Sequence, residues 1–175
     1  MDPIYEQRGE NGYSLTPEVY GDFLIRLFEL WLRDREKGEF LYIHYFESLA
    51  GQLLGHPPVS CGLMGVCSEQ NVIEADGSVY PCDFYALDEY CLGNINSDSM
   101  EQMDGARLPF LRSSFGGLEK CRGCRYGFIC HGGCRRDRQG PDGLGTNAYC
   151  ESYMRFFDYA LPKLVQLLHE NGHQV

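Results

Sequence analysis

The residues with the clearest chemical potential are four cysteines within residues 121–134, a stretch that reads Cys-Arg-Gly-Cys-Arg-Tyr-Gly-Phe-Ile-Cys-His-Gly-Gly-Cys. Two, five and three residues separate consecutive thiols, and four glycines fill the gaps. Because glycine accepts positive φ, such a backbone can wrap tightly enough to turn several thiolates toward one centre. Buried apolar cysteines have no reason to gather at this spacing. The stretch therefore predicts a metal or metal-cluster site.

Five more cysteines lie outside this stretch, and four of them bring the number of candidate ligands to eight. The eight are Cys61, Cys67, Cys82, Cys121, Cys124, Cys130, Cys134 and Cys150. Eight thiolates fill two four-thiolate sites, and both zinc and iron–sulfur clusters accept four thiolates. The ligand count alone leaves a zinc-binding structural or interaction domain open beside a cluster-binding one.

Basic residues crowd the same stretch of an otherwise acidic chain, namely Arg122, Arg125, Arg135, Arg136 and Arg138. A four-iron cluster with four thiolates carries net negative charge, which these guanidinium groups can offset. A solvated face or a carboxylate-binding patch is the alternative interpretation. Two histidines, His44 and His131, are interpreted as structural, because the cysteines already suffice as ligands.

The composition argues against some partners. The chain has 175 residues, of which 43% are apolar, and a formal net charge of −10. Binding to phosphate backbones needs clustered Lys and Arg, so we expect no nucleic-acid partner. No apolar run approaches the roughly 20 residues that span a bilayer, and residues 1–12 do not resemble a secretion signal. We expect a cytoplasmic protein with no membrane partner, whose reduced thiols serve as ligands.

Residues 1–58 predict the end of an α/β domain. Thr16 can cap a helix that begins at Pro17 and ends at Gly38. The run 40–46 is rich in aromatic and β-branched residues, which favours a buried strand containing His44, and residues 47–54 suit a short helix. Such a piece cannot close a sheet by itself, so we expect a larger domain before it. The sequence His-Pro-Pro at 56–58 marks the predicted boundary.

Residues 59–175 form the second predicted domain. Residues 71–75 and 78–80 flank the turn pair Asp76-Gly77 and predict a β-hairpin. Residues 87–104 are interpreted as an acidic connector, and residues 109–118 as an apolar, glycine-rich link. Apolar residues at helical spacing predict a final helix over about residues 152–171. The predicted fold class is therefore α+β.

The cysteine pattern resembles a known module. The order and spacing of these cysteines are similar to those of the SPASM domain. The pattern is Cys61, fifteen residues, Gly77, four residues, Cys82, then the dense stretch and Cys150. That domain is the auxiliary module of radical S-adenosylmethionine (SAM) enzymes that modify peptides and proteins. Cys67 and the runs 80–85 and 92–95 resemble the anaerobic sulfatase-maturating enzymes in particular. The upstream helix and predicted strand are similar to the end of their radical SAM barrel.

This resemblance implies two [4Fe-4S] clusters in a small, irregular domain with a β-hairpin and flanking helices, preceded by the last piece of a (β/α) barrel. Cys61, Cys67, Cys82 and Cys134 would hold cluster I, and Cys121, Cys124, Cys130 and Cys150 would hold cluster II. Cys134 then crosses over from the dense stretch to the earlier thiols, which ties two lobes into one unit. Cys91 fits neither cluster and is interpreted as a spare thiol, or as a substitute if Cys67 is not a ligand.

The resemblance also implies a reaction. In the family, a 5′-deoxyadenosyl radical removes a β-hydrogen from a Cys or Ser of a sulfatase polypeptide, and the product is formylglycine. Asp83 occupies the position of the proposed proton acceptor, and a carboxylate beside a cluster ligand can take the thiol or hydroxyl proton. An electron carrier such as ferredoxin or flavodoxin is a further implied partner.

One part of the family pattern does not occur in the sequence. The Cys-x3-Cys-x2-Cys triad that binds the SAM cluster is found nowhere in the 175 residues. We therefore expect the chain to be the C-terminal part of a longer enzyme, inactive alone, whose barrel holds SAM and a third [4Fe-4S] cluster. A SPASM module of a peptide-crosslinking radical SAM enzyme is a narrower alternative, against which the run 80–85 speaks.

Overall fold

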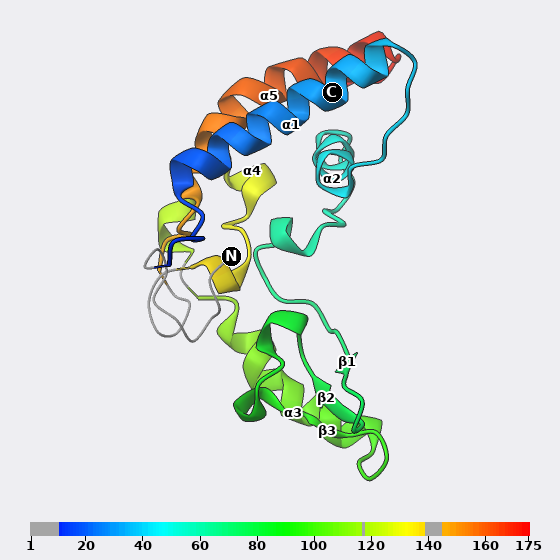
Figure 1. Cartoon of the computed structure of the whole chain (residues 1–175), viewed down its shortest axis with the longest axis vertical. Coiled ribbons are helices and arrows are strands. Elements are labelled where there is room, and N and C mark those ends of the chain that lie inside the picture. Colours follow the sequence, from blue (N-terminus) through cyan, green and yellow to red (C-terminus); the bar gives the residue numbers. More distant parts are fainter. Residues whose placement is uncertain (1–10, 117, 139–144) are drawn as a thin grey trace.

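The computed structural model describes residues 11–116, 118–138 and 145–175, and Figure 1 shows their arrangement. The α-helices are α1 (Pro17–Glu36), α2 (His44–Leu53), α3 (Met100–Ser113), α4 (Gly127–Cys130) and α5 (Cys150–Glu170). The strands are β1 (Val72–Ile73), β2 (Ser78–Tyr80) and β3 (Gly93–Asn94). Short 3-10 turns cover Cys61–Leu63, Asp83–Tyr85, Asp88–Tyr90, Glu119–Cys121 and Arg135–Asp137. The long helices α1 and α5 lie at one end, the sheet and α3 at the other, and the cysteine-bearing segments between them.

Helix α1 confirms the prediction that a helix begins at Pro17. Thr16 is its N-cap, and the Thr16 side-chain oxygen accepts a hydrogen bond from the Val19 N–H at 3.3 Å. Proline suits the first turn because that turn has no intrahelical partner for an N–H group. After the helix, Gly38 has a φ of +80°, which turns the chain away from the helix axis.

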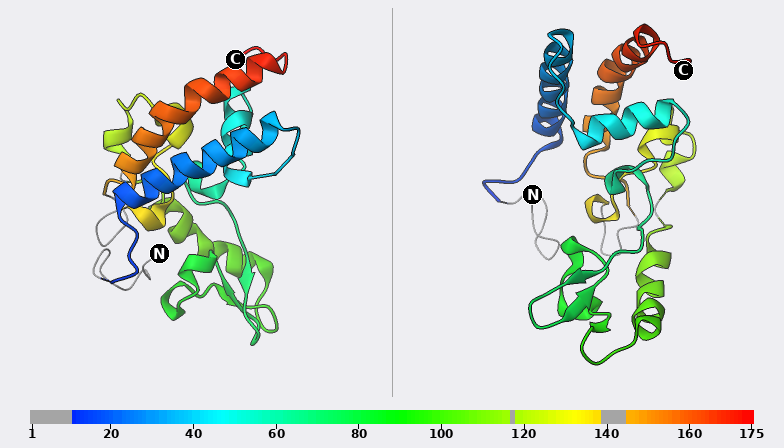
Figure 2. Two further views of the ribbon diagram at one scale, coloured as in Figure 1. Left: turned by 45° about the horizontal axis from the view of Figure 1, so that its top comes forward. Right: turned by 90° about the vertical axis from the view of Figure 1, so that its right-hand side faces the viewer.

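Helix α5 confirms the predicted final helix, and α1 packs along it (Figures 1 and 2). The close approach depends on Gly21, because a Cβ there would lie 3.4 Å from the Ser152 Cα. The Ser152 hydroxyl also donates a hydrogen bond of 2.5 Å to the Pro17 carbonyl. These contacts hold the first part of the chain against the helix that carries Cys150.

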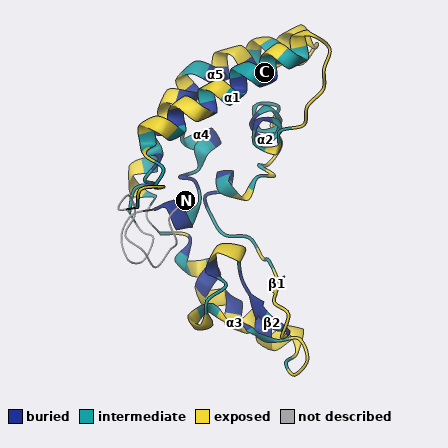
Figure 3. Ribbon diagram, viewed as in Figure 1, coloured by how far each residue is buried: buried dark blue, intermediate teal, exposed yellow. Residues whose placement is uncertain are grey.

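The main core lies where α2 meets the α1–α5 pair. The rings of Phe28, Phe46 and Phe156 contact one another, with centroid separations of 5.2, 5.8 and 5.9 Å. Burying such a side chain contributes roughly 1.5–3 kcal/mol. Figure 3 shows the buried residues of the long helices on the sides that face each other and α2. Leu63 and Ile129 belong to the same core, so both cysteine-bearing turns are anchored in it.

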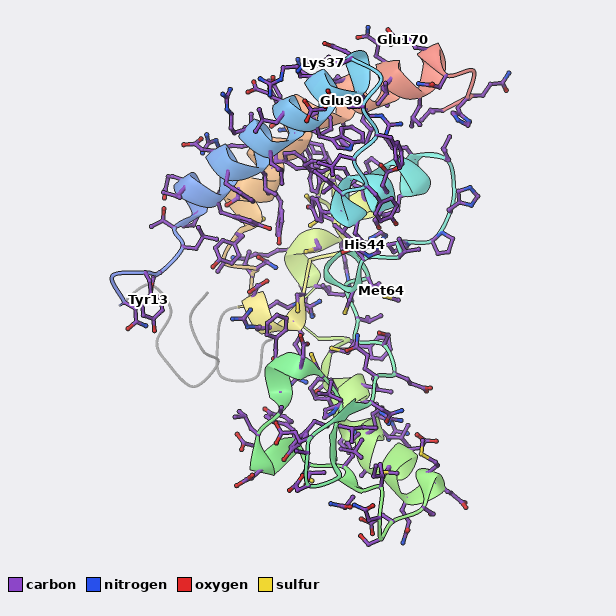
Figure 4. The ribbon with its side chains drawn as sticks, turned by 45° about the vertical axis from the view of Figure 1, so that its right-hand side comes forward. Tyr13, Lys37, Glu39, His44, Met64 and Glu170 are labelled. Carbon is purple, nitrogen blue, oxygen red and sulfur yellow. The ribbon has the colours of Figure 1, made fainter. Side chains whose placement is uncertain are left out.

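The strand predicted over residues 40–46 is wrong. Residues 40–43 form no regular element, and α2 begins at His44, which is exposed (Figure 4). Phe46 and Leu49 are three positions apart and both are buried, which is the spacing of a helix face. Leu41 supplies a carbonyl to the Trp31 indole N–H at 3.0 Å instead of to a neighbouring strand. A short apolar run does not distinguish a strand from a buried helix.

The hairpin predicted over residues 71–80 is confirmed as β1 and β2, with Val72 opposite Tyr80 and Ile73 opposite Val79. Gly77 makes the turn with a φ of +88°, which favours glycine. Strand β3 adds to β2 in antiparallel register, so the sheet has three strands in the order β1-β2-β3. The third strand lies in the segment that the sequence suggested was a connector.

Helix α3 corrects the interpretation of residues 87–104 and 109–118 as connector and link. Ser99 and Gln102 form a capping box, in which each side chain accepts a hydrogen bond from the backbone of the other. Pro109 lies inside the helix rather than in a loop. The buried Arg107 guanidinium ties α3 to Asn71, just before β1. The mixed helices and small antiparallel sheet agree with an α+β fold.

The predicted boundary at residue 58 stays a prediction, as does the barrel origin of residues 1–58. Trp31 and Phe46 on one side of it share the main core with Leu63 and Phe156 on the other. Among the residues described, no helix has the length and apolar character needed to cross a lipid bilayer.

Candidate metal centres

Cys61, Cys67, Cys82 and Cys134, which we call group one, come from four turns. Cys61 begins the first 3-10 turn, Cys67 follows it in a loop, and Cys82 and Cys134 each directly precede a 3-10 turn. The four are close enough for their thiolate charges to repel one another, since Cys134 interacts with Cys61, Cys67 and Cys82. The structure brings these four thiols into one neighbourhood.

Three thiols of group one, those of Cys67, Cys82 and Cys134, are held in their neutral form in the metal-free chain. Burial raises the pKa of Cys82 to about 12 and the pKa of Cys134 to about 11, and neighbouring thiols add repulsion. Burial likewise raises the pKa of Cys67. A thiolate is the ligand form, so a cation or cluster iron must supply the positive charge that releases these protons.

Cys121, Cys124, Cys130 and Cys150, which we call group two, surround one cavity. This cavity is small, about 30 Å³, and part of it is open to solvent. The aromatic rings of Tyr153 and Phe157 on α5 close its other side. Burial raises the pKa of Cys130 to about 11, and repulsion from the other three thiols adds to it. All four thiols predicted for cluster II therefore face a common space.

The two groups share one piece of unusual backbone. His131 has a φ of +52°, and Gly132 and Gly133 follow with φ of +87° and +68°. The His131 Nδ1 donates to the Leu63 carbonyl at 2.8 Å, which joins this backbone to the turn after Cys61. Gly65 packs against it so closely that a Cβ there would lie 2.8 Å from the His131 Cβ. His131 thus has the structural role predicted for it.

Ser114 is a contributor that the sequence did not reveal. Its side chain is fully buried, and its Oγ accepts a hydrogen bond of 2.9 Å from the Cys67 N–H. The same Oγ donates to the Leu111 carbonyl at 2.6 Å. Because 47 positions separate Ser114 from Cys67, no local sequence signal could pair them.

The five arginines of the dense stretch have different environments. Arg138 is buried and interacts with the charges of Cys67, Cys121 and Cys134. Arg135 lies over the Tyr85 and Phe110 rings, at 5.2 and 4.9 Å from their centroids. Arg136 is also buried, and its guanidinium lies 4.1 Å from the centroid of the Phe84 ring. In contrast, Arg122 and Arg125 are exposed, and Arg125 donates a hydrogen bond to Asp158 at 2.7 Å.

Asp83 lies beside group one. It is exposed at the start of a 3-10 turn, and the Cys82 Sγ lies 3.3 Å from its Oδ1. Cys91 is also exposed, and its Sγ contacts the Gly93 carbonyl at 3.6 Å. Its role as a spare thiol stays a prediction.

The donor sets suit a group larger than a single ion. Within the described ranges, no three His, Cys, Asp or Glu side chains converge closely enough to hold one metal ion. The four thiols of group two instead line one common cavity. An iron–sulfur cluster presents one iron to each of four thiolates around a bulky inorganic core, which fits an all-thiol set spread in this way.

Comparisons with known proteins point to the same chemistry. Residues 61–125 match the family model SPASM, described as an iron-sulfur cluster-binding domain. The chain is 43% identical over 171 residues to a cysteine-type anaerobic sulfatase-maturating enzyme of Clostridium perfringens, covering 95% of this chain and 46% of that protein. It is 32% identical over 159 residues to a serine-type enzyme of Bacteroides thetaiotaomicron, covering 86% of this chain and 37% of that protein.

A solved structure described as native anSMEcpe with bound AdoMet and Kp18Cys peptide superposes with a TM-score of 0.89 at 42% identity. The match covers 97% of this chain and 48% of that chain. A second, described as native anSMEcpe with bound AdoMet and Cp18Cys peptide, gives the same TM-score and identity. The chain thus spans about half the length of the relatives that it matches.

Proposed function

We propose that this chain is the auxiliary-cluster region of a radical SAM oxidoreductase. The chain carries a SPASM domain and belongs with the C-terminal part of the anaerobic sulfatase-maturating enzymes. That enzyme oxidises a Cys or Ser of a sulfatase to formylglycine. The observation that carries the proposal is the gathering of eight cysteines into two neighbourhoods of four. The higher identity to the cysteine-type relative favours a cysteine substrate.

The two groups are the proposed ligands of two [4Fe-4S] clusters. Group one holds cluster I, supported by the mutual repulsion of its thiols and by Ser114, which fixes the backbone at Cys67. Group two holds cluster II, supported by the cavity that all four thiols line. When bound, such clusters supply one-electron transfer. An electron carrier such as ferredoxin or flavodoxin, and a radical SAM segment with its own cluster, complete the proposed system.

Asp83 is the proposed proton acceptor. It is the exposed carboxylate beside Cys82, so a substrate peptide can reach it from solvent. The carboxylate takes the proton of the substrate thiol or hydroxyl as the adjacent carbon loses an electron. The peptides bound in the two solved relatives support a peptide-binding face of this kind.

Iron and sulfide analysis tests the ligand sets. The chain, loaded without oxygen, is expected to be brown and to bind about eight iron atoms, four in each cluster. Cys67→Ala and Cys130→Ala should each lose about half of the iron, and their double variant nearly all. Cys91→Ala is the matched control and should lose none. A colourless chain that takes up two zinc ions, or equal losses in all three single variants, would contradict the assignment.

Turnover by the enzyme that contains this chain and a radical SAM segment tests Asp83. Asp83→Asn should reduce formylglycine formation on a sulfatase peptide by about a hundredfold or more, the usual loss when a general base is removed, with unchanged iron content. Asp88→Asn, at the next exposed 3-10 turn, is the control. Mass spectrometry of the peptide separates formylglycine from a thioether or carbon–carbon crosslink. Unchanged turnover in Asp83→Asn removes this residue from the mechanism.

A further inference from the structure

Arg138 lies where the two groups of thiols meet. It is only 4% exposed, at the end of the 3-10 turn that follows Cys134. Its Nη1 donates to the carbonyls of Ser114 and Gly116, both at 2.8 Å. Its Nη2 donates to the carbonyls of Gly65 and Gly133. One guanidinium thus binds four backbone carbonyls that come from three separate segments.

Those segments carry or support the ligands of group one. Gly65 lies in the loop between Cys61 and Cys67, and Gly133 directly precedes Cys134. Ser114 receives the Cys67 N–H on its hydroxyl while its carbonyl receives Arg138. The arginine therefore fixes the backbone on both sides of this group at once.

Group two is within reach of the same guanidinium. A Cβ placed on Gly132 would lie 3.4 Å from the Cys121 Sγ and 3.8 Å from the Arg138 Nη2, so both atoms lie close to this glycine. Arg138 attracts the thiolate forms of Cys67 and Cys121, which belong to different groups. Its charge acts on both groups from one position.

Among the described residues, Arg138 forms no ion pair with a carboxylate. The ion pairs formed among the described residues include Arg125 with Asp158 and Arg155 with Asp22, but none involves Arg138. Backbone carbonyls satisfy its N–H groups without neutralising its charge. A buried charge is costly unless a countercharge compensates it, and among the described residues the negative groups that act on Arg138 are the thiols of Cys67, Cys121 and Cys134.

We propose that Arg138 is a shared positioning residue, which holds the backbone of group one and supplies the countercharge for the iron–sulfur clusters of both groups. This inference rests on the proposed function, because it requires that both groups hold clusters. A reduced cluster carries one more negative charge than an oxidised one, and a fixed cation in a low-dielectric interior stabilises the reduced form. Removal of the charge should therefore make both reduction potentials more negative.

Two substitutions separate the charge from the hydrogen-bonding geometry. Arg138→Lys keeps the charge and loses the planar fork, whereas Arg138→Gln keeps an amide donor and loses the charge. Both are made in the full chain, loaded with iron and sulfide without oxygen. Iron content is measured first, and the potential of each cluster then comes from a redox titration followed by electron paramagnetic resonance. Arg125→Gln, which removes an exposed arginine already paired with Asp158, is the control.

We expect Arg138→Lys to load both clusters with potentials near those of the unchanged chain, and Arg138→Gln to shift both potentials to more negative values. Loading of Arg138→Lys together with failure of Arg138→Gln to load would support the same role in assembly. Equal behaviour of the two variants, including failure of both to load, would overturn the role of charge. A shift in one cluster alone would overturn the shared role. If the unchanged chain binds no cluster, the proposed function fails and this inference fails with it.

Discussion

At the scale of single residues, positive φ angles decide where the thiols can turn. Gly65 has a φ of +71° and lies between Cys61 and Cys67. It packs against the backbone of His131, which itself adopts a left-handed conformation beside Cys130. The turn between Cys61 and Cys67 in group one thus packs directly against the turn beside Cys130 in group two, and neither turn tolerates much displacement.

Gly65→Ala should lower the stability of the metal-free chain. The left-handed backbone alone costs about 1–2 kcal/mol for a residue with a Cβ, and overlap with His131 adds to this. For a chain of this size each kcal/mol lowers the Tm by roughly 2–4 °C. Gly62→Ala is the control, because its Cβ would meet nothing within 4 Å. Thermal unfolding followed by circular dichroism distinguishes the two, and equal Tm values would show that the Gly65 contact is not strained.

At the scale of elements, the α1–α5 pair with α2 is the platform on which group two rests. Tyr153, Phe156 and Phe157 follow Cys150 on α5 and present their rings to the cavity or to the core. Phe28 on α1 is fully buried against Phe156. The position of the fourth thiol of group two therefore depends on packing between two helices that are far apart in sequence.

Phe28→Ala should destabilise the fold by about 3–5 kcal/mol, because it removes a buried ring and leaves a cavity. Phe23→Ala on the same helix is the matched control, since this ring is 54% exposed, and its effect should stay within about 0.5 kcal/mol. Urea unfolding of the metal-free chain gives both values. A difference below about 1 kcal/mol between the variants would mean that the α1–α5 contact contributes little to stability.

The same elements explain what the sequence could and could not predict. Thr16, Pro17 and helical apolar spacing identified α1, and the same spacing identified α5. Helix α3 was missed because Pro109 and scattered apolar residues masked it, although Ser99 and Gln102 carried a capping signal. The run 40–46 was too short to distinguish a strand from the start of α2.

At the scale of the whole molecule, the eight candidate ligands were predictable because the number and spacing of cysteines can be read directly from the sequence. Their grouping followed from a family resemblance and stays a prediction, which the charge interactions within group one and the shared cavity of group two support. The partners of Arg138 were not predictable. Its contact with Gly65 joins residues 73 positions apart, and only the folded chain brings such segments together.

The position of Cys134 fixes an order of events during synthesis. Three sulfurs of group one have been made once the ribosome has passed Cys82, yet the fourth follows only after most of the dense stretch. By then group two also lacks a single member, Cys150, which emerges on the last helix. With the proposed ligand sets, neither centre can be finished until the last of its cysteines, Cys134 or Cys150, has been made, so iron and sulfide must be delivered after the dense stretch has been synthesised.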